Sequence, residues 1–126
     1  MKPIYIKSNI RISFSKDGVV SISNRALEIL IHKNTQDPYY IHFLTDTTGT
    51  DGSKALYCYI DNRAINGIRL RYEKNRMIGN SKALVEQLSL LMDWPLSATK
   101  LASVAYNVDE TTISRDGISD HIHQLI

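Results

Sequence analysis

Cysteine and long apolar runs are scarce in this sequence, and each scarcity excludes a class of protein. Cys58 is the single cysteine, so an intrachain disulfide and a cysteine metal cluster are both excluded. No apolar run approaches the roughly 20 residues that a membrane-spanning helix requires. The first seven residues carry no apolar stretch behind Lys2 and do not resemble a secretory signal peptide. We therefore expect a cytoplasmic protein without a membrane partner.

Motifs that indicate catalysis or metal binding are also missing from the sequence. It contains no Gly-x-Ser-x-Gly, no His-Glu-x-x-His and no glycine-rich phosphate loop. His121 and His123 would share one face of a strand, but no third metal ligand lies near them in the sequence. The acidic residues are too scattered to predict a catalytic pair: Asp46, Asp51, Asp61 and Glu73. We therefore expect no enzyme activity, no cofactor and no metal site.

The pattern of apolar residues predicts a strand, a turn, a second strand and a helix near the start of the chain. Ile10, Ile12 and Phe14 alternate with polar residues, which is the period of a strand with one buried face. The Asp-Gly pair that ends at Gly18 is a strong hairpin signal, and residues 19–22 form the expected return strand. Ser23 or its neighbour would then cap a short helix that carries an apolar stripe.

The same order of features returns later in the chain, which predicts an internal repeat. Residues 10–16 match residues 68–74 in physical role, and the cap and helix of each unit match at an offset of 57 residues. We therefore predict two hairpin–helix repeats, at about residues 10–31 and 68–92. Together they predict an α+β fold of small antiparallel sheets or a barrel, with two short packing helices, in a single domain over residues 1–126.

The rest of the chain predicts further strands and less regular segments. Residues 39–44 and 55–60 are rich in β-branched, aromatic and apolar side chains and predict two strands, joined by a polar loop over residues 45–53. Alternation over residues 101–108 favours a strand, with a short helix as the alternative. The polar composition of residues 109–126 leads us to expect a frayed tail.

Positive charge gathers in one part of the sequence. The segment from Arg63 to Lys82 holds six cations against one anion, a net charge of +5. If Ile68, Leu70 and Tyr72 face the core, the residues between them must face solvent; a register slipped by one residue would expose Tyr72 instead. Guanidinium groups on such a strand can bind phosphates bidentately. The predicted nucleic-acid-binding residues are Arg69, Arg71, Lys74 and Arg76, supported by Arg11 and Arg25. The alternative is an exposed sheet face that charge keeps in solution.

The turn, strand, cap and leucine-bearing helix over residues 16–30 resemble the core of AbrB/MazE-type swapped-hairpin proteins, and the resemblance extends weakly to about residue 60. The resemblance implies a homodimeric transcription regulator or antitoxin that binds double-stranded DNA through basic residues of its paired hairpins. The sequence departs from the family pattern at Val19, where arginine is usual, and at Ser23, where proline is usual. A chain with two units could also replace the family dimer.

A second hypothesis is a protein-interaction or structural module of a mobile element or phage, with no catalytic activity. Its basis is the tyrosines that lie in one predicted hairpin: Tyr39, Tyr40, Tyr57 and Tyr59. Tyrosine is enriched at protein interfaces. The expected partner is therefore either duplex DNA or another protein, and a homo-oligomer is a further expectation.

Overall fold

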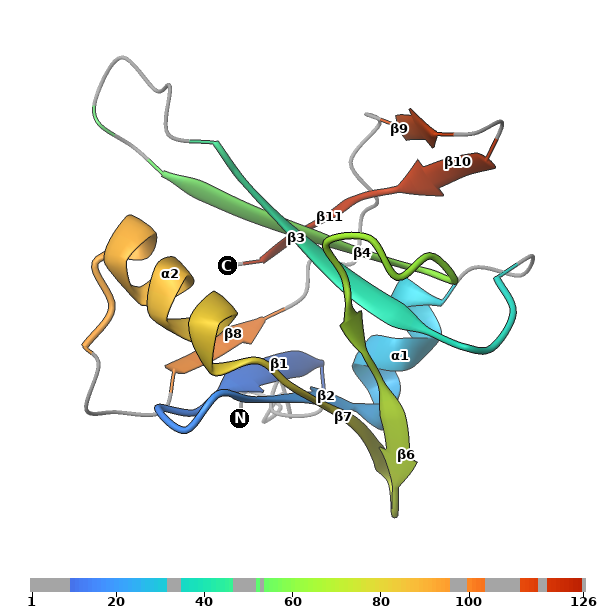
Figure 1. Ribbon diagram of the computed structural model, residues 1–126, viewed down its shortest axis with the longest axis horizontal. Coiled ribbons are helices and arrows are strands. Elements are labelled where there is room, and N and C mark those ends of the chain that lie inside the picture. The colour runs from blue at the N-terminus through green and yellow to red at the C-terminus, as the bar shows by residue number, and fades with distance from the viewer. Residues whose placement is uncertain are drawn as a thin grey trace, which may run out of the picture.

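The computed structural model describes residues 10–31, 35–46, 52, 54–95, 100–103, 112–115 and 118–125. Over these residues the chain folds into antiparallel sheets with two helices, which confirms the expected α+β class (Figure 1). The sheets are not closed into a barrel. No helix in the described ranges is long and apolar enough to cross a bilayer.

The larger sheet has five strands in the order β6-β7-β2-β1-β8. Their bounds are Arg11–Phe14 for β1, Val19–Ser23 for β2, Arg71–Glu73 for β6, Arg76–Asn80 for β7 and Lys100–Ser103 for β8. β1 with β2, and β6 with β7, form hairpins at the predicted places. Antiparallel pairing of β2 with β7, in which Ser21 lies opposite Ile78, joins the two hairpins into one sheet.

Each of the two hairpins leads directly into a helix with a serine cap. The helices are α1, Asn24–Leu30, and α2, Lys82–Met92. The hydroxyl of Ser23 accepts a hydrogen bond from the backbone of Ala26, and that of Ser81 accepts one from Leu84. Such caps satisfy N–H groups that have no partner inside the helix. The capping predicted from the sequence is thus confirmed, with serine chosen over asparagine in both helices.

The smaller sheet has four strands in the order β11-β4-β3-β5, beside a separate hairpin of β9 and β10. Their bounds are Tyr40–Asp46 for β3, Ala55–Asp61 for β4, Ile68–Arg69 for β5, Thr112–Arg115 for β9, Ile118–His121 for β10 and His123–Leu125 for β11. The segment that we expected to be frayed therefore contains three strands. Most of the polar loop over residues 45–53 lies outside the described residues, as do residues 104–108 of the strand expected at 101–108.

One hydrophobic cluster includes side chains from both of these sheets and both helices. Phe14 and Met77 from the larger sheet, Ile41 from the smaller sheet and Leu30 from α1 are each no more than 1% exposed. Cys58 of β4 lies in the same cluster, and burial raises the pKa of its thiol. The neutral, buried thiol is therefore part of the core and is not a nucleophile.

The first turn lies in close contact with the start of α2. Gly18 has a φ of +90°, and its carbonyl oxygen accepts a hydrogen bond from the backbone of Ser81 at 2.8 Å. A Cβ atom at Gly18 would lie 2.5 Å from the backbone of Lys82. Glycine is therefore required here by its conformation and by the lack of space.

We predict that Gly18→Ala lowers the free energy of unfolding by about 3 kcal/mol, because backbone strain adds to a clash with the backbone of α2. The matched control is Gly52→Ala, which also has a positive φ, of +78°, but no atom within 4 Å of the added Cβ. Its cost should be about 1 kcal/mol. Urea unfolding of both variants measures the difference, and equal costs would contradict the tight contact between Gly18 and α2.

Candidate nucleic-acid interface

The strand expected over residues 68–73 is divided between the two sheets. β5 pairs with β3, with Arg69 opposite Tyr40, and β6 pairs with β7, with Arg71 opposite Ile78. Leu70 lies between them, and its backbone N–H donates to the carbonyl oxygen of Tyr39 at 2.9 Å. The chain therefore passes from one sheet to the other without a loop.

The segment that crosses between the sheets passes close to β7 at Gly79. A Cβ atom at this position would lie 2.6 Å from a side-chain carbon of Ile68 and 3.1 Å from the carbonyl oxygen of Arg69. The missing side chain leaves room for the crossing segment. This crossing could not be predicted from the sequence, because a continuous alternating pattern looks the same in one sheet as in two.

Alternation holds for the first four residues of this segment and then fails. Ile68 and Leu70 are 8% and 3% exposed, whereas Arg69 and Arg71 are exposed, as the pattern predicted. The expectation that Tyr72 faces the core is wrong, because its side chain is 67% exposed. Residues 71–76 are all exposed, and in Figure 1 the β6–β7 hairpin extends away from the body of the protein. Neither face of this hairpin tip is covered.

The four predicted cations of residues 69–76 differ in their partners. Arg76 lies 3.8 Å from the carboxylate of Glu73, and it donates to the hydroxyl of Ser21 at 3.4 Å. Lys74 lies in the turn with a φ of +56°. Within the described residues, no carboxylate lies within 4.0 Å of the charged groups of Arg69, Arg71 or Lys74. Three of the four cations are therefore available to a ligand, and the fourth is partly neutralised.

The two supporting arginines belong to the first hairpin and its helix. Arg11 of β1 is half-buried, and its backbone N–H donates to the hydroxyl of Ser23 at 3.2 Å. Ser23 lies opposite Arg76 in the β2–β7 pair, so Arg11 and Arg76 flank it on neighbouring strands. Arg25 is exposed in the first turn of α1. Arg11 thus lies one strand away from the second hairpin, whereas Arg25 lies on α1 and outside the sheet.

Tyr72 is a residue of this surface that the sequence pattern assigned to the core. The pKa of Tyr39 is raised above its usual value. Desolvation is the main cause, and the nearby ionisable groups of Tyr72 and Asp37 add smaller contributions. Tyr39 lies beside this segment, because its carbonyl oxygen accepts a hydrogen bond from the backbone of Leu70 at 2.9 Å. An exposed aromatic ring between Arg71 and Lys74 offers a flat apolar surface beside positive charge, a combination that can stack on unpaired nucleic-acid bases.

A second group of polar residues is buried in the smaller sheet. The Nε2 atom of His42 lies 2.6 Å from Oδ1 of Asp61, and both side chains are 3% exposed. The same carboxylate oxygen accepts a hydrogen bond from the backbone of Arg63 at 3.0 Å. The ring of His42 stacks on Tyr59 with 4.6 Å between ring centroids.

This buried pair holds β3, β4 and the chain that follows β4 in a fixed arrangement. A Cβ atom at Gly67 would lie 2.7 Å from the ring of His42, so the chain packs directly over it. The pairing of His42 with Asp61 could not be derived from sequence, because the two residues are 19 positions apart. Among the residues that the structure describes, no group of three or more histidine, cysteine, aspartate or glutamate side chains could hold a metal ion. We assign the pair a structural role.

Comparison with known proteins gives no relative from which a function can be transferred. No family model, no curated protein and no solved structure matches the chain. The function is therefore inferred from the exposed cations and the contacts around them.

We predict that Asp61→Asn lowers the free energy of unfolding by about 2 kcal/mol, because a buried, hydrogen-bonded carboxylate is replaced by a neutral amide. Asp93→Asn is the matched control, since Asp93 contacts Lys54 at 2.7 Å but is 78% exposed. Its cost should stay below about 0.5 kcal/mol. Chemical denaturation compares the two variants, and a negligible loss in Asp61→Asn would contradict the structural role.

Proposed function

We propose that the protein binds duplex DNA through residues 69–76, which we call the basic ribbon. The observation that carries the proposal is the unbroken exposure of residues 71–76 at the tip of a projecting hairpin. Arg69, Arg71 and Lys74 supply positive charge with no carboxylate partner in the described structure. Binding of these cations to phosphates would release counterions, which favours association and makes it depend on salt.

The shape of the basic ribbon also supports duplex DNA as the ligand. β7 pairs with β2 over its whole length, so the part that can enter the major groove, which is about 12 Å wide, is the turn between β6 and β7. Arginine can contact phosphates or guanine edges with two parallel hydrogen bonds. Arg71 and Arg76 lie on the two strands of the hairpin, so a duplex that receives it would meet cations from both.

The pairing of the two hairpins supports the proposed repeat and, through it, the resemblance to swapped-hairpin regulators. Ser21 and Ile78 lie opposite each other and are 57 positions apart, so a two-fold axis at this pair would relate the two strands. The serine caps and the helices correspond at an offset of 58, one residue more than the 57 expected from the sequence, with Leu27 matching Val85 and Leu30 matching Leu88 as buried residues. We propose that one chain supplies both hairpins that the family dimer shares, and that it acts as a regulator or antitoxin-like module.

The protein-interaction hypothesis has weaker support from the same structure. Of the tyrosines on which it was based, Tyr59 is 3% exposed, and Tyr39, Tyr40 and Tyr57 are half-buried. These side chains pack within the fold and do not form an open aromatic surface. These four tyrosines therefore do not provide an exposed surface to which a partner protein could bind.

We predict that the protein binds a short, fluorescently labelled DNA duplex at low salt and releases it as salt rises. The double variant Arg69→Glu with Arg71→Glu should weaken binding by at least about tenfold and reduce the salt dependence by about two released ions. Fluorescence anisotropy over a salt series measures both quantities. Because both arginines are exposed, circular dichroism should show an unchanged fold.

The matched control for this experiment is Lys82→Glu, which reverses one exposed charge in the first turn of α2. It lies beyond the other end of β7, roughly 15 Å or more along the strand from the turn at Lys74. Glutamate is also favourable at a helix N-terminus, so the variant should fold. Equal loss of binding in the control and the double variant, or no binding by the unmodified protein at low salt, would refute the proposed interface.

A further inference from the structure

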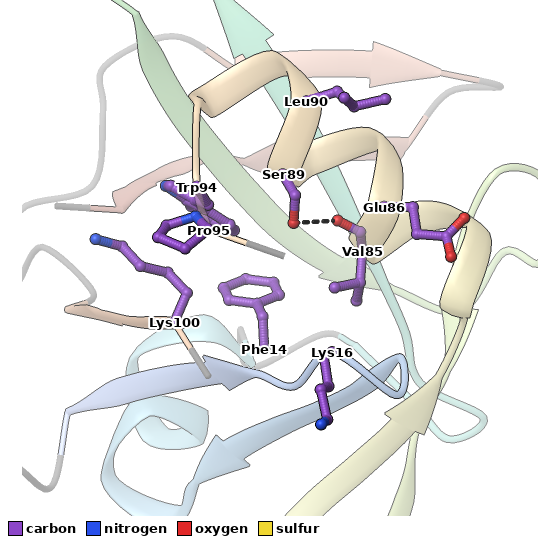
Figure 2. Close-up of a pocket in the computed structure, with 9 residues that line it drawn as sticks. All are labelled: Phe14, Lys16, Val85, Glu86, Ser89, Leu90, Trp94, Pro95 and Lys100. Carbon is purple, nitrogen blue, oxygen red and sulfur yellow. Dashed lines mark hydrogen bonds between the residues drawn. The ribbon is translucent and has the colours of Figure 1, made fainter. Parts of the chain in front are cut away.

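A cavity of about 220 Å³ lies between α2 and the edge of the larger sheet, away from the basic ribbon (Figure 2). Its lining consists of Phe14, Lys16, Val85, Glu86, Ser89, Leu90, Trp94, Pro95 and Lys100. Most of these side chains are apolar, so the cavity can remove an apolar group from water. Leu90, which is 73% exposed, lies at its rim on α2.

The apolar part of the cavity has two aromatic walls. The rings of Phe14 and Trp94 lie 5.2 Å apart between centroids, with 44° between their planes. Figure 2 shows the side chain of Val85 directed toward the ring of Phe14, with Trp94 and Pro95 on the other side. An arrangement of tilted rings favours an aromatic guest, which can stack on one wall and meet the other with its edge.

Charge at the cavity favours an anion. The ammonium group of Lys100 lies 5.8 Å from the centre of the Trp94 ring. In the described part of the chain it has no carboxylate within 4.0 Å. Figure 2 shows the carboxylate of Glu86 and the ammonium of Lys16 directed away from the aromatic walls. The charge nearest to the walls is therefore the positive charge of Lys100.

A second cavity, of about 260 Å³, also borders on Trp94 and Lys100. It shares Trp94 and Lys100 with the first, and its remaining lining includes Lys54, Leu56 and Leu125. Lys54 is already paired with Asp93 at 2.7 Å. Both cavities are lined by Lys100, which has no carboxylate partner among the described residues. The space beside its ammonium group can hold the carboxylate of a ligand.

We propose that the cavity at Trp94 and Lys100 binds a small molecule with an aromatic ring and a carboxylate. The ring packs against the contacting rings of Phe14 and Trp94 from the cavity side, and the carboxylate accepts a hydrogen bond from the ammonium of Lys100. This site is separate from the basic ribbon and does not depend on DNA binding.

Trp94 is the single tryptophan, so its fluorescence reports directly on this cavity. The test is a titration with phenylacetate, 2-phenylethanol and phenethylamine, which share a phenyl ring and differ in charge. Phenylacetate should show saturable binding, about threefold tighter than the neutral alcohol, and the amine should bind most weakly. Identical titrations of N-acetyltryptophanamide correct for collisional quenching. Absence of saturation, or equal affinity for the three compounds, would overturn the proposal.

Two substitutions locate the site. Lys100→Gln should weaken phenylacetate binding about threefold and leave 2-phenylethanol unaffected, because Lys100 is exposed and contributes charge alone. The control Lys82→Gln should change neither affinity. Ser89→Leu should fill the cavity and abolish binding of both compounds; because Ser89 is buried, its fold is checked by circular dichroism. Unchanged phenylacetate affinity in Lys100→Gln would reject the site even if Ser89→Leu does not fold.

Discussion

The antiparallel pairing of β2 with β7 is the interaction on which the rest of this structure depends. Five residue pairs, from Val19 with Asn80 to Ser23 with Arg76, join two hairpins that would otherwise be marginally stable ribbons. The same pairing brings the first turn, at Gly18, against the start of α2. It also leaves the end of the second hairpin beyond the body of the protein, so one contact fixes both the core and the exposed cations.

Local features of this fold could be predicted from the sequence, whereas the long-range ones could not. Alternation, the Asp-Gly turn and the serine caps depend on neighbouring residues, so they identified the hairpins and helices. The division of residues 68–73 between two sheets depends on Gly79, which lies in another strand. Tyr72 is likewise exposed because no other part of the described structure covers the end of its hairpin, which residue alternation within the hairpin cannot reveal. For the same reason, spacing could not reveal that His42 pairs with Asp61.

Charge on the basic ribbon has two physical consequences. β6 is one of the two edge strands of the larger sheet, and an edge strand with unpaired backbone groups can associate with another chain. Arg71 and Glu73 on this strand oppose such pairing. However, protection of an edge needs charge of either sign, and the hairpin carries more cations than anions. The proposed DNA binding would account for the excess of positive charge, which protection of an edge strand does not require.

These two roles make different predictions for individual residues in the presence of DNA, and NMR distinguishes them most directly. Backbone amide resonances of the unmodified protein would be followed as a short duplex is added at low salt. The account predicts that the largest shifts cluster at residues 69–76 and diminish when salt is raised. Shifts that are absent, or that cluster on α2 or the smaller sheet instead, would contradict it.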